Sequence, residues 1–371
     1  MRALFLTKYG LQGGSSRYMV HDYVEFYEQA GIACTVFPLF DDRYFNFQVL
    51  DKPTGLSEIM RHAGYYLSRV ASRLGHLFSA RRYDVVVFEK ELVPYVPYGL
   101  EAILKLLQPK TVMLLDDATY IYYARHPSAL VRLACRNKIE RVMQACAHII
   151  VWNEHLGEYA RRFNPSVSVV NTGIDLRRYR VKETARDGMP DTSRAVIGWI
   201  GTPNSFPYVR TLESVFQTLA RHYNVELHVI SSQPYTSPHI NVVNKTWSLQ
   251  TEIEDLLALD IGIMPLPDDE WTRGKSGAKA VQYMATGVPT VCSAVGVAPH
   301  LIQDGINGLL ASNAHEWESK LTFLIENPTL RREMGLRGRR TVEDTYCLQA
   351  VAPRLIRILY EAGQHSLQGQ A

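Results

Sequence analysis

The chain has 371 residues, of which 46% are hydrophobic and 21% are charged, so it has the length of two domains and the composition of a soluble globular protein. Its formal net charge of +3 neither requires nor excludes a nucleic acid or a membrane as partner. Five cysteines without a C-x-x-C pair argue against a disulfide scaffold, and no apolar run approaches the roughly 18 residues of a spanning helix, so we expect a cytoplasmic protein.

Short apolar runs alternate with longer amphipathic stretches, as in parallel, doubly wound sheets. The first series of expected strands is 2–7, 35–39, 85–88, 112–115, 148–152 and 167–170. Helical spacing is expected between several of these strands, for example at 17–30 and 97–107. The second series of expected strands is 196–200, 227–231, 240–243, 260–266 and 288–293. The sequence therefore predicts an α/β fold with two Rossmann-like, doubly wound parallel-sheet domains facing a cleft.

The two series of strands are separated by a highly charged segment, residues 181–194, which also contains Gly188 and Pro190. This composition is typical of a linker between domains. We therefore expect an N-terminal domain at residues 1–180 and a C-terminal domain at residues 195–349.

Residues 56–82 combine an apolar stripe at helical spacing with a strong excess of positive charge. The stripe consists of Ile59, Ala63, Leu67, Val70, Leu74, Leu77 and Phe78. The basic residues are Arg61, Arg69, Arg73, Arg81 and Arg82, against Glu58 as the acidic residue. Two interpretations stay open. Such a helix usually packs its apolar stripe on a protein core, but a basic amphipathic helix is also suited to an anionic membrane surface.

Glycines and carboxylates follow two of the N-terminal strands, at the edge of an open α/β sheet where ligands bind. Gly13 and Gly14 allow the backbone to approach a phosphate or a sugar closely, although a tight turn also explains them. Asp116 and Asp117 end the fourth strand, where an N-cap is the simpler interpretation. Adjacent side chains at a strand end point in opposite directions, and no His/Cys/Asp cluster has metal-ligand spacing, so we expect no metal site.

The most informative stretch runs from residue 260 to residue 307. An apolar strand is followed by the loop R-G-K-S-G at 273–277, a helical segment and another strand. This arrangement places an anion at a helix N-terminus. Lys275 and Lys279 lie one turn apart within reach of a phosphate, with a solvated helix face as the alternative. A Walker A loop is not expected, because Asp269 stands where that motif needs glycine.

Several motifs resemble glycosyltransferase family 4. The segment G-K-x-x-x-K-x-x-Q-Y-M-A-x-G-x-P at 274–289, followed by S-x-V-G and D-G-x-N-G-L-L, is similar to the donor-binding region of that family. The N-terminal glycine loop, N-T-G-I-D at 171–175 and I-G-W-I-G at 197–201 follow the family's order. The resemblance covers residues 1 to about 360. It implies a GT-B fold, a retaining enzyme that uses nucleotide sugars, and a C-terminal helix at 350–364 packing back on the first domain.

The resemblance also implies a set of site residues. Donor binding is expected at Gly14, Gly201, Thr202, Arg273, Lys275, Lys279 and Gln282. Two positions depart from the family: Gly274 and Gln282 stand where its E-x7-E motif has glutamates, and the loop after Ile200 lacks its Arg and Lys. We expect Lys275, or else Arg273 or Lys279, to supply that charge.

Three residues are expected to act in catalysis. Lys275 would stabilise the departing diphosphate. Asp116 and Asp117 occupy the place of a family histidine that faces the reacting sugar, and either carboxylate would orient or deprotonate the acceptor hydroxyl.

The resulting functional prediction is a transferase that moves a sugar from a nucleoside-diphosphate sugar to an acceptor hydroxyl with retention, in cell-surface glycan or glycoconjugate biosynthesis. UDP or GDP is the expected donor nucleotide, with no further cofactor. The expected acceptor is a glycan, a lipid-linked molecule or a protein. Peripheral contact of residues 56–82 with the inner face of the plasma membrane is a further expectation, and a nucleic-acid partner is not expected. The alternatives are a nucleotide-sugar epimerase on the same fold and a non-catalytic nucleotide- or sugar-binding protein.

Overall fold

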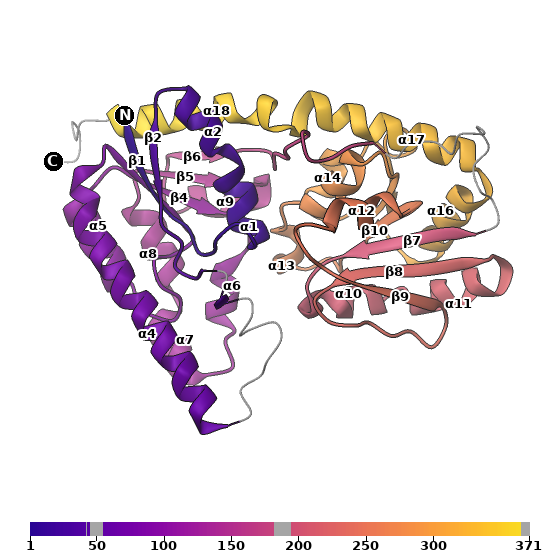
Figure 1. The fold of residues 1–371 in the computed structure, drawn as a ribbon, viewed down its shortest axis with the longest axis horizontal. Coiled ribbons are helices and arrows are strands. Elements are labelled where there is room, and N and C mark those ends of the chain that lie inside the picture. The colour runs from indigo at the N-terminus through magenta and orange to yellow at the C-terminus, as the bar shows by residue number, and fades with distance from the viewer. Residues whose placement is uncertain (42, 45–54, 182–193, 365–371) are drawn as a thin grey trace. The chain divides into compact units, whose positions relative to one another are not determined.

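The structure is a computed structural model that describes residues 1–41, 43–44, 55–181 and 194–364. It divides into two compact units, each built around a six-stranded sheet (Figure 1). The first unit consists of Met1–Gly173, Gly274–Ser276 and the C-terminal segment from Val351, and the second of Ile174–Arg273 and Gly277–Ala350. Most of the expected linker, 181–194, lies outside the described residues.

The sheet of the first unit is parallel throughout, with the order β2-β1-β3-β4-β5-β6. Its strands are β1 (Arg2–Leu6), β2 (Ala33–Val36), β3 (Val85–Glu89), β4 (Thr111–Leu115), β5 (His148–Val151) and β6 (Val167–Val169). Every residue of β3 and β4 is buried, which is why these strands read as continuous apolar runs. Parallel pairing brings the carboxyl ends of β1, β3 and β4 to one edge of the sheet, where the polar loops follow.

Helices connect the strands of the first unit. They are α1 (Gly14–Met19), η1 (His21–Tyr23), α2 (Val24–Gln29), α4 (Leu56–Ser79), η2 (Ala80–Arg82), α5 (Gly99–Leu107), α6 (Thr119–Ala124), α7 (Ala129–Cys135), α8 (Lys138–Ala145) and α9 (Glu154–Arg161). The prediction of one helix at 17–30 is wrong, because the backbone leaves helical geometry at Val20 (φ −134°, ψ −60°). The final helix, α18 (Leu348–Gln364), contacts this unit where the Tyr360 hydroxyl donates to Ala30 O at 2.6 Å.

Helix α4 directs a polar face towards the rest of the first unit. Arg69 donates to the carbonyls of Leu39 (2.7 Å) and Pro38 (2.9 Å), and the buried Arg73 donates to the carbonyl of Thr7 (2.6 Å). The carbonyls of Pro38 and Leu39 lie beyond the end of β2, where strand pairing no longer supplies donors, whereas Thr7 O also accepts from Leu39 N–H (2.8 Å). Arg69 and Arg73 therefore help to hold α4 on the rest of the first unit.

The apolar residues of α4 largely face outwards, with Leu77 as a buried exception, which is contrary to the first of the two interpretations, packing of the stripe on a core. The most exposed are Leu56 (74%), Met60 (66%), Leu67 (66%) and Phe78 (71%). They belong to one line along the helix, completed by the exposed Ala63, Ala71 and Leu74. Among the described residues, no helix is both long and apolar enough to cross a membrane.

The sheet of the second unit is also parallel, with the order β12-β11-β10-β7-β8-β9. Its strands are β7 (Ala195–Ile200), β8 (Val225–Ser231), β9 (Asn241–Thr246), β10 (Ile261–Met264), β11 (Thr290–Ser293) and β12 (Leu309–Ala311). The sequence analysis missed β12, which has three residues and carries too little apolar pattern to be recognised.

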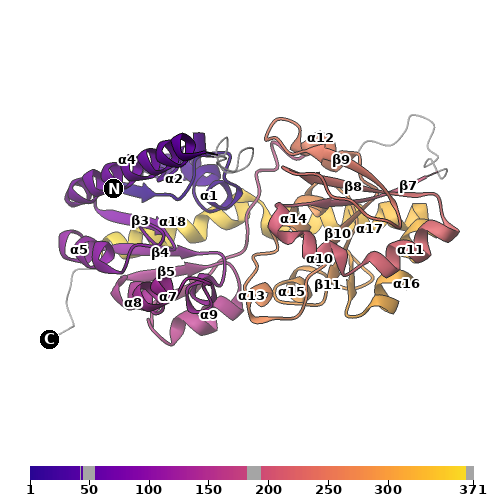
Figure 2. The ribbon, with the colours of Figure 1, turned by 90° about the horizontal axis from the view of Figure 1, so that it is seen from below.

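The helices of the second unit surround this sheet, and α14 packs against β10 and β11 (Figure 2). They are η3 (Pro203–Ser205), α10 (Phe206–Arg210), α11 (Glu213–His222), α12 (Glu252–Leu257), α13 (Glu270–Arg273), α14 (Ala278–Ala285), α15 (Ala298–Leu301), α16 (Ala314–Glu326), α17 (Pro328–Thr341) and η4 (Val342–Tyr346). Buried residues from the strands, α11 and α16 form the core, with Trp199 and Phe216 among the largest.

Gly335 of α17 allows this helix to approach the end of α14. A Cβ atom at position 335 would overlap the carbonyl group of Gly287, and backbone has little freedom to move away. We therefore expect Gly335→Ala to destabilise the second unit by about 1–3 kcal/mol. Urea unfolding of the variant checks this, with Gly99→Ala as the control, because a Cβ atom at Gly99 would have no neighbour within 4 Å. A Gly335→Ala protein as stable as wild type would contradict the packing.

Candidate active site

The glycine loop of the first unit lies directly after β1 and leads into α1. A Cβ atom at Gly13 would overlap the side chain of Tyr9, so this position needs glycine, and Gly14 opens the helix. The buried Ser16 accepts a hydrogen bond from Tyr9 N–H (2.9 Å) and donates one to Glu89 Oε2 (2.8 Å). Hydrogen bonds through Ser16 therefore connect the loop to Glu89.

Glu89 ends β3 and is 1% exposed. Its Oε2 atom also accepts from the backbone N–H of Lys8 at 3.0 Å. Burial raises the pKa of Glu89 to about 7, although the hydrogen bonds from Lys8 and Ser16 act in the opposite direction. The sequence analysis missed Glu89, and the available signal was a single carboxylate at the end of an otherwise apolar strand.

This raised pKa predicts a pH dependence of stability. The folded protein keeps a proton on Glu89 that the unfolded chain releases between the ordinary pKa of 4.5 and about 7. The free energy of unfolding should therefore fall as the pH rises through this window, by at most about 1.4 kcal/mol per pH unit. Glu89→Gln removes the titrating group, so its urea midpoint should fall less from pH 5 to pH 7.

The control for this measurement is Glu28→Gln, which changes an exposed glutamate for which the same pH profile as wild type is expected. Parallel profiles for the wild type and Glu89→Gln would contradict the assignment of the buried proton.

Asp116 and Asp117 follow β4 and form a cluster with two lysines. Lys90 Nζ lies 2.7 Å from Asp116 Oδ1 and 3.4 Å from Asp117 Oδ2. Lys275 Nζ lies 3.1 Å from Asp117 Oδ1. Lys90 follows β3 with a positive φ of 55°, a conformation that non-glycine residues seldom adopt and that is often found at functional sites. The sequence analysis did not identify Lys90.

Asp117 is held in its charged form. Burial acts to raise the pKa of its carboxyl group, but the ammonium groups of Lys90 and Lys275 outweigh burial and lower that pKa below its ordinary value. A carboxylate with a lowered pKa is a weak base near neutral pH. The lowered pKa therefore leaves the Asp117 carboxylate better suited to accepting a hydrogen bond than to removing a proton.

The loop that carries Lys275 is held by backbone contacts within the first unit. Asn153 Nδ2 donates to Lys275 O and Thr172 Oγ1 donates to Ser276 O, each at 3.0 Å. A Cβ atom at Gly274 would lie 3.0 Å from Ala118 Cβ, so the loop approaches the residue after Asp117 closely. This close packing explains why glycine stands at position 274, where the resembled family has glutamate.

In the second unit, Gly201 and Lys279 lie together. Lys279 Nζ is 4.5 Å from the centre of the Trp199 ring, and a Cβ atom at Gly201 would come within 2.6 Å of that Nζ. Thr202 is exposed and immediately precedes η3. The loop after β7 and the first turn of α14 therefore place an ammonium group next to a glycine backbone, which suits an anionic ligand.

Tyr283 fixes α14 relative to two strands. Its hydroxyl accepts from Ile200 N–H at 2.9 Å and donates to Ile263 O at 3.3 Å. A Cβ atom at Gly262 would overlap the Tyr283 ring, so glycine in β10 allows the ring to lie against the strand. These contacts hold Lys279 at the carboxyl end of β7.

Two further predicted donor residues have other partners in the structure. Gln282 is 5% exposed, and its Nε2 donates to the Tyr179 hydroxyl at 3.2 Å. Arg273 forms a two-pronged pair with Asp268 (2.6 and 3.0 Å) at the surface. Of the predicted residues, the structure thus brings together Asp116, Asp117 and Lys275 in the first unit, and Gly201, Thr202 and Lys279 in the second. Gly14 lies in the glycine loop after β1.

A metal site was not expected. In the part of the chain that the structure describes, no group of three or more His, Cys, Asp or Glu residues is arranged to hold a metal ion.

Comparison with known sequences gives a family for part of the chain. Residues 194–327 match the family described as "Glycosyl transferases group 1". The curated trehalose synthase of Pyrococcus horikoshii is 29% identical over 87 residues, which are 24% of this chain and 21% of that protein. The match thus spans about a fifth of the relative. Residues 194–327 are thus similar to group 1 glycosyltransferases.

Comparison with solved structures covers nearly the whole chain. Sucrose-phosphate synthase from Thermosynechococcus elongatus is 15% identical, with a TM-score of 0.67 over 98% of this chain and 100% of that one. HepE from Anabaena, solved in complex with UDP-glucose, is 12% identical, with a TM-score of 0.68 over 97% and 100%. At these identities the likeness shows the fold alone. The predicted α/β, GT-B fold class is confirmed.

Proposed function

We propose that the chain is a glycosyltransferase that moves a sugar from a nucleoside-diphosphate sugar to an acceptor hydroxyl with retention of configuration, as in glycosyltransferase family 4. The observation that carries this proposal is the match of residues 194–327 to group 1 glycosyltransferases, on a fold shared with such enzymes over the full chain. The curated relative matches over a short segment, so the activity of the whole chain is an inference from its own residues.

The second unit is proposed to bind the donor diphosphate. Lys279 beside Gly201 supplies an ammonium group, and Thr202 adds a hydroxyl. The UDP-glucose complex of HepE supports UDP as the first nucleotide to test, with GDP next. The proposal needs no metal ion, because the lysines themselves offset the phosphate charge.

In the first unit, Asp117 is proposed to orient the acceptor hydroxyl and Lys275 to bind the departing diphosphate. Lys275 pairs with Asp117 in the structure, so binding a phosphate would exchange one anion for another at the same ammonium group. The phosphate oxygen of the leaving group would take the proton of the hydroxyl, since the lowered pKa of Asp117 makes that carboxylate a poor proton acceptor.

The donor site is tested by nucleotide binding. Lys279→Met is expected to weaken the binding of UDP or GDP by about tenfold, because one charge-assisted contact is lost. Calorimetric titration of the purified protein measures the dissociation constant, and Lys245→Met on β9 is the matched control. An unchanged dissociation constant for Lys279→Met would remove this residue from the donor site.

The transfer reaction is tested by the release of free nucleoside diphosphate with and without a glycan acceptor. Release that depends on the acceptor supports the transferase. Change of the sugar without an acceptor would indicate an epimerase, and nucleotide binding without turnover would indicate a binding protein. The acceptor is proposed to be lipid-linked or part of a cell-surface glycan, in line with WaaG, a structural neighbour described as involved in lipopolysaccharide biosynthesis.

Helix α4 is proposed to contact the surface of an anionic membrane. Its exposed line of Leu56, Met60, Leu67 and Phe78 is apolar, and the exposed Arg81 and Arg82 follow directly after it in η2. An apolar face next to arginines matches the acyl boundary and the anionic headgroups of such a membrane.

Flotation with lipid vesicles tests this contact. The wild type should float with vesicles that contain phosphatidylglycerol and less with pure phosphatidylcholine. Leu67→Ser with Phe78→Ser should reduce the bound fraction by more than about tenfold, because two large side chains no longer enter the lipid. The matched control replaces Phe323 and Leu330, which are 40% and 41% exposed on the second unit. If the α4 variant instead converts a dimer to a monomer, a second copy of the chain is the partner.

A further inference from the structure

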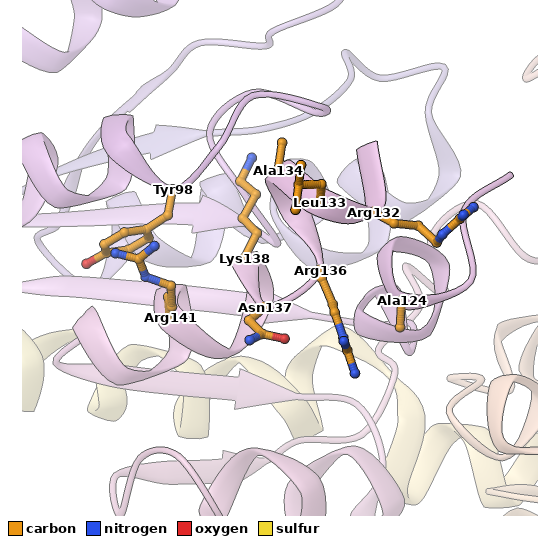
Figure 3. Close-up of a pocket in the computed structure, with 9 residues that line it drawn as sticks. All are labelled: Tyr98, Ala124, Arg132, Leu133, Ala134, Arg136, Asn137, Lys138 and Arg141. Atoms are coloured by element: carbon orange, nitrogen blue, oxygen red, sulfur yellow. The ribbon is translucent and has the colours of Figure 1, made fainter. Parts of the chain in front are cut away.

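The first unit contains an open pocket of about 600 Å³. None of the candidate site residues lines it. It lies between Tyr98, the end of α6, and the segment from α7 into α8 (Figure 3). This volume is within the range of small-molecule sites. Arg132, Arg136, Lys138 and Arg141 line the pocket, and none of the described lining residues carries a carboxylate.

Two of these cations already have partners in the protein. Lys138 Nζ lies 2.6 Å from Glu91 Oε2 and 3.6 Å from Glu101 Oε1. Arg132 Nη1 donates to the carbonyls of His126 (2.6 Å) and Pro127 (2.9 Å). Lys138 therefore has little capacity left for a ligand, and the Nη1 group of Arg132 is already occupied.

The other two cations are available to a ligand. Arg136 and Arg141 are exposed, and within the described part of the chain neither guanidinium has an ion pair. The Arg141 guanidinium carbon lies 4.5 Å from the centre of the Tyr98 ring, and Figure 3 shows the two side chains against each other. Stacking on a ring holds the guanidinium plane while its N–H groups stay free to donate.

We propose that this pocket binds the phosphate group of a phosphorylated ligand through Arg136 and Arg141. Guanidinium groups donate paired hydrogen bonds to the anionic oxygens of a phosphate. A neutral sugar has no such anionic oxygens. Asn137 lies between the two arginines at the start of α8, where the first N–H groups of the helix have no acceptor within it. Leu133 also lines the pocket and is 85% exposed, so an apolar chain on the phosphate has a surface to contact. The inference is independent of the proposed sugar transfer.

Binding of three probes without any nucleotide tests the proposal. Octyl phosphate carries a phosphate and a chain, inorganic phosphate carries the charge alone, and octyl glucoside carries the chain alone. Calorimetric titration of the full chain is repeated with Arg136→Gln/Arg141→Gln. The control is Arg210→Gln/Arg221→Gln, which removes the same charge from the second unit and includes an arginine stacked on a ring, Arg210 on Tyr235.

Octyl phosphate should bind the wild type and the control equally, and the pocket variant about tenfold or more weakly. Equal binding of inorganic phosphate would indicate a soluble phosphate ligand, whereas preference for octyl phosphate would indicate a lipid phosphate. The proposal is overturned if neither phosphate probe binds, if the pocket variant keeps wild-type affinity, or if octyl glucoside binds as tightly as octyl phosphate. Loss of nucleotide binding elsewhere in the chain would not alter these outcomes.

Discussion

Asp117→Asn is expected to lower the rate of sugar transfer about 100-fold or more, without weakening the binding of the donor nucleotide. The amide keeps the size of the side chain but loses the charge that Lys90 and Lys275 hold in place. A hydroxyl that donates to the carboxylate in the reacting complex then has a weaker and differently directed acceptor. Initial rates of nucleoside-diphosphate release at saturating donor measure the effect.

The matched control for Asp117→Asn is Glu254→Gln, which also replaces an ion-paired carboxylate by an amide, here in an exposed pair with Arg180. This control should retain wild-type rates. An Asp117→Asn protein with full activity would show that the charge at this position is structural. A pH profile separates the two possible roles, because an orienting carboxylate with a lowered pKa leaves the rate unchanged between pH 6 and 8.

The strands could be predicted from the sequence because parallel strands buried on both faces need continuous apolar runs. The direction of those strands also predicts the edge of the sheet at which the glycine loop and Asp116 lie. Lys90 could not be predicted, since its significance lies in a contact with residues 26 and 27 positions later, and a single lysine after a strand has no pattern.

The orientation of α4 could not be predicted from its own residues. Its apolar stripe is the stronger pattern, yet Arg69 faces inwards because the carbonyls after β2 need donors, and Arg73 is a second donor to Thr7 O beside Leu39 N–H. That need arises from the ends of strands more than 30 residues away, which the spacing within the helix does not show. The same contacts leave Leu67 and Phe78 exposed, and it is this exposure that favours a membrane or protein partner for the helix.

Lys138→Met is the second change with a large expected effect, in this case on stability. The Lys138 side chain is 1% exposed, and its ammonium group lies between Glu91 and Glu101, whose side chains are 6% and 2% exposed. It also donates to Val93 O at 2.6 Å. Removing one partner from a buried ionic group leaves uncompensated charge, so we expect a loss of about 3–5 kcal/mol. Urea unfolding at pH 8 measures it, with the exposed Lys105→Met as control.

The sign of the pH dependence identifies the cause of this loss. Burial already raises the pKa of Glu101, and without Lys138 that pKa rises further. A carboxyl group with a raised pKa in the folded state reduces stability above that pKa and ceases to do so once it is protonated. The difference between Lys138→Met and wild type should therefore shrink from pH 8 to pH 5, and adding Glu101→Gln should recover part of it at pH 8. A difference independent of pH would point to lost packing of the lysine chain. Because Lys138 lines the phosphate pocket as a structural cation, its replacement would disturb the site through folding, whereas Arg136 and Arg141 can be changed at the surface without that cost.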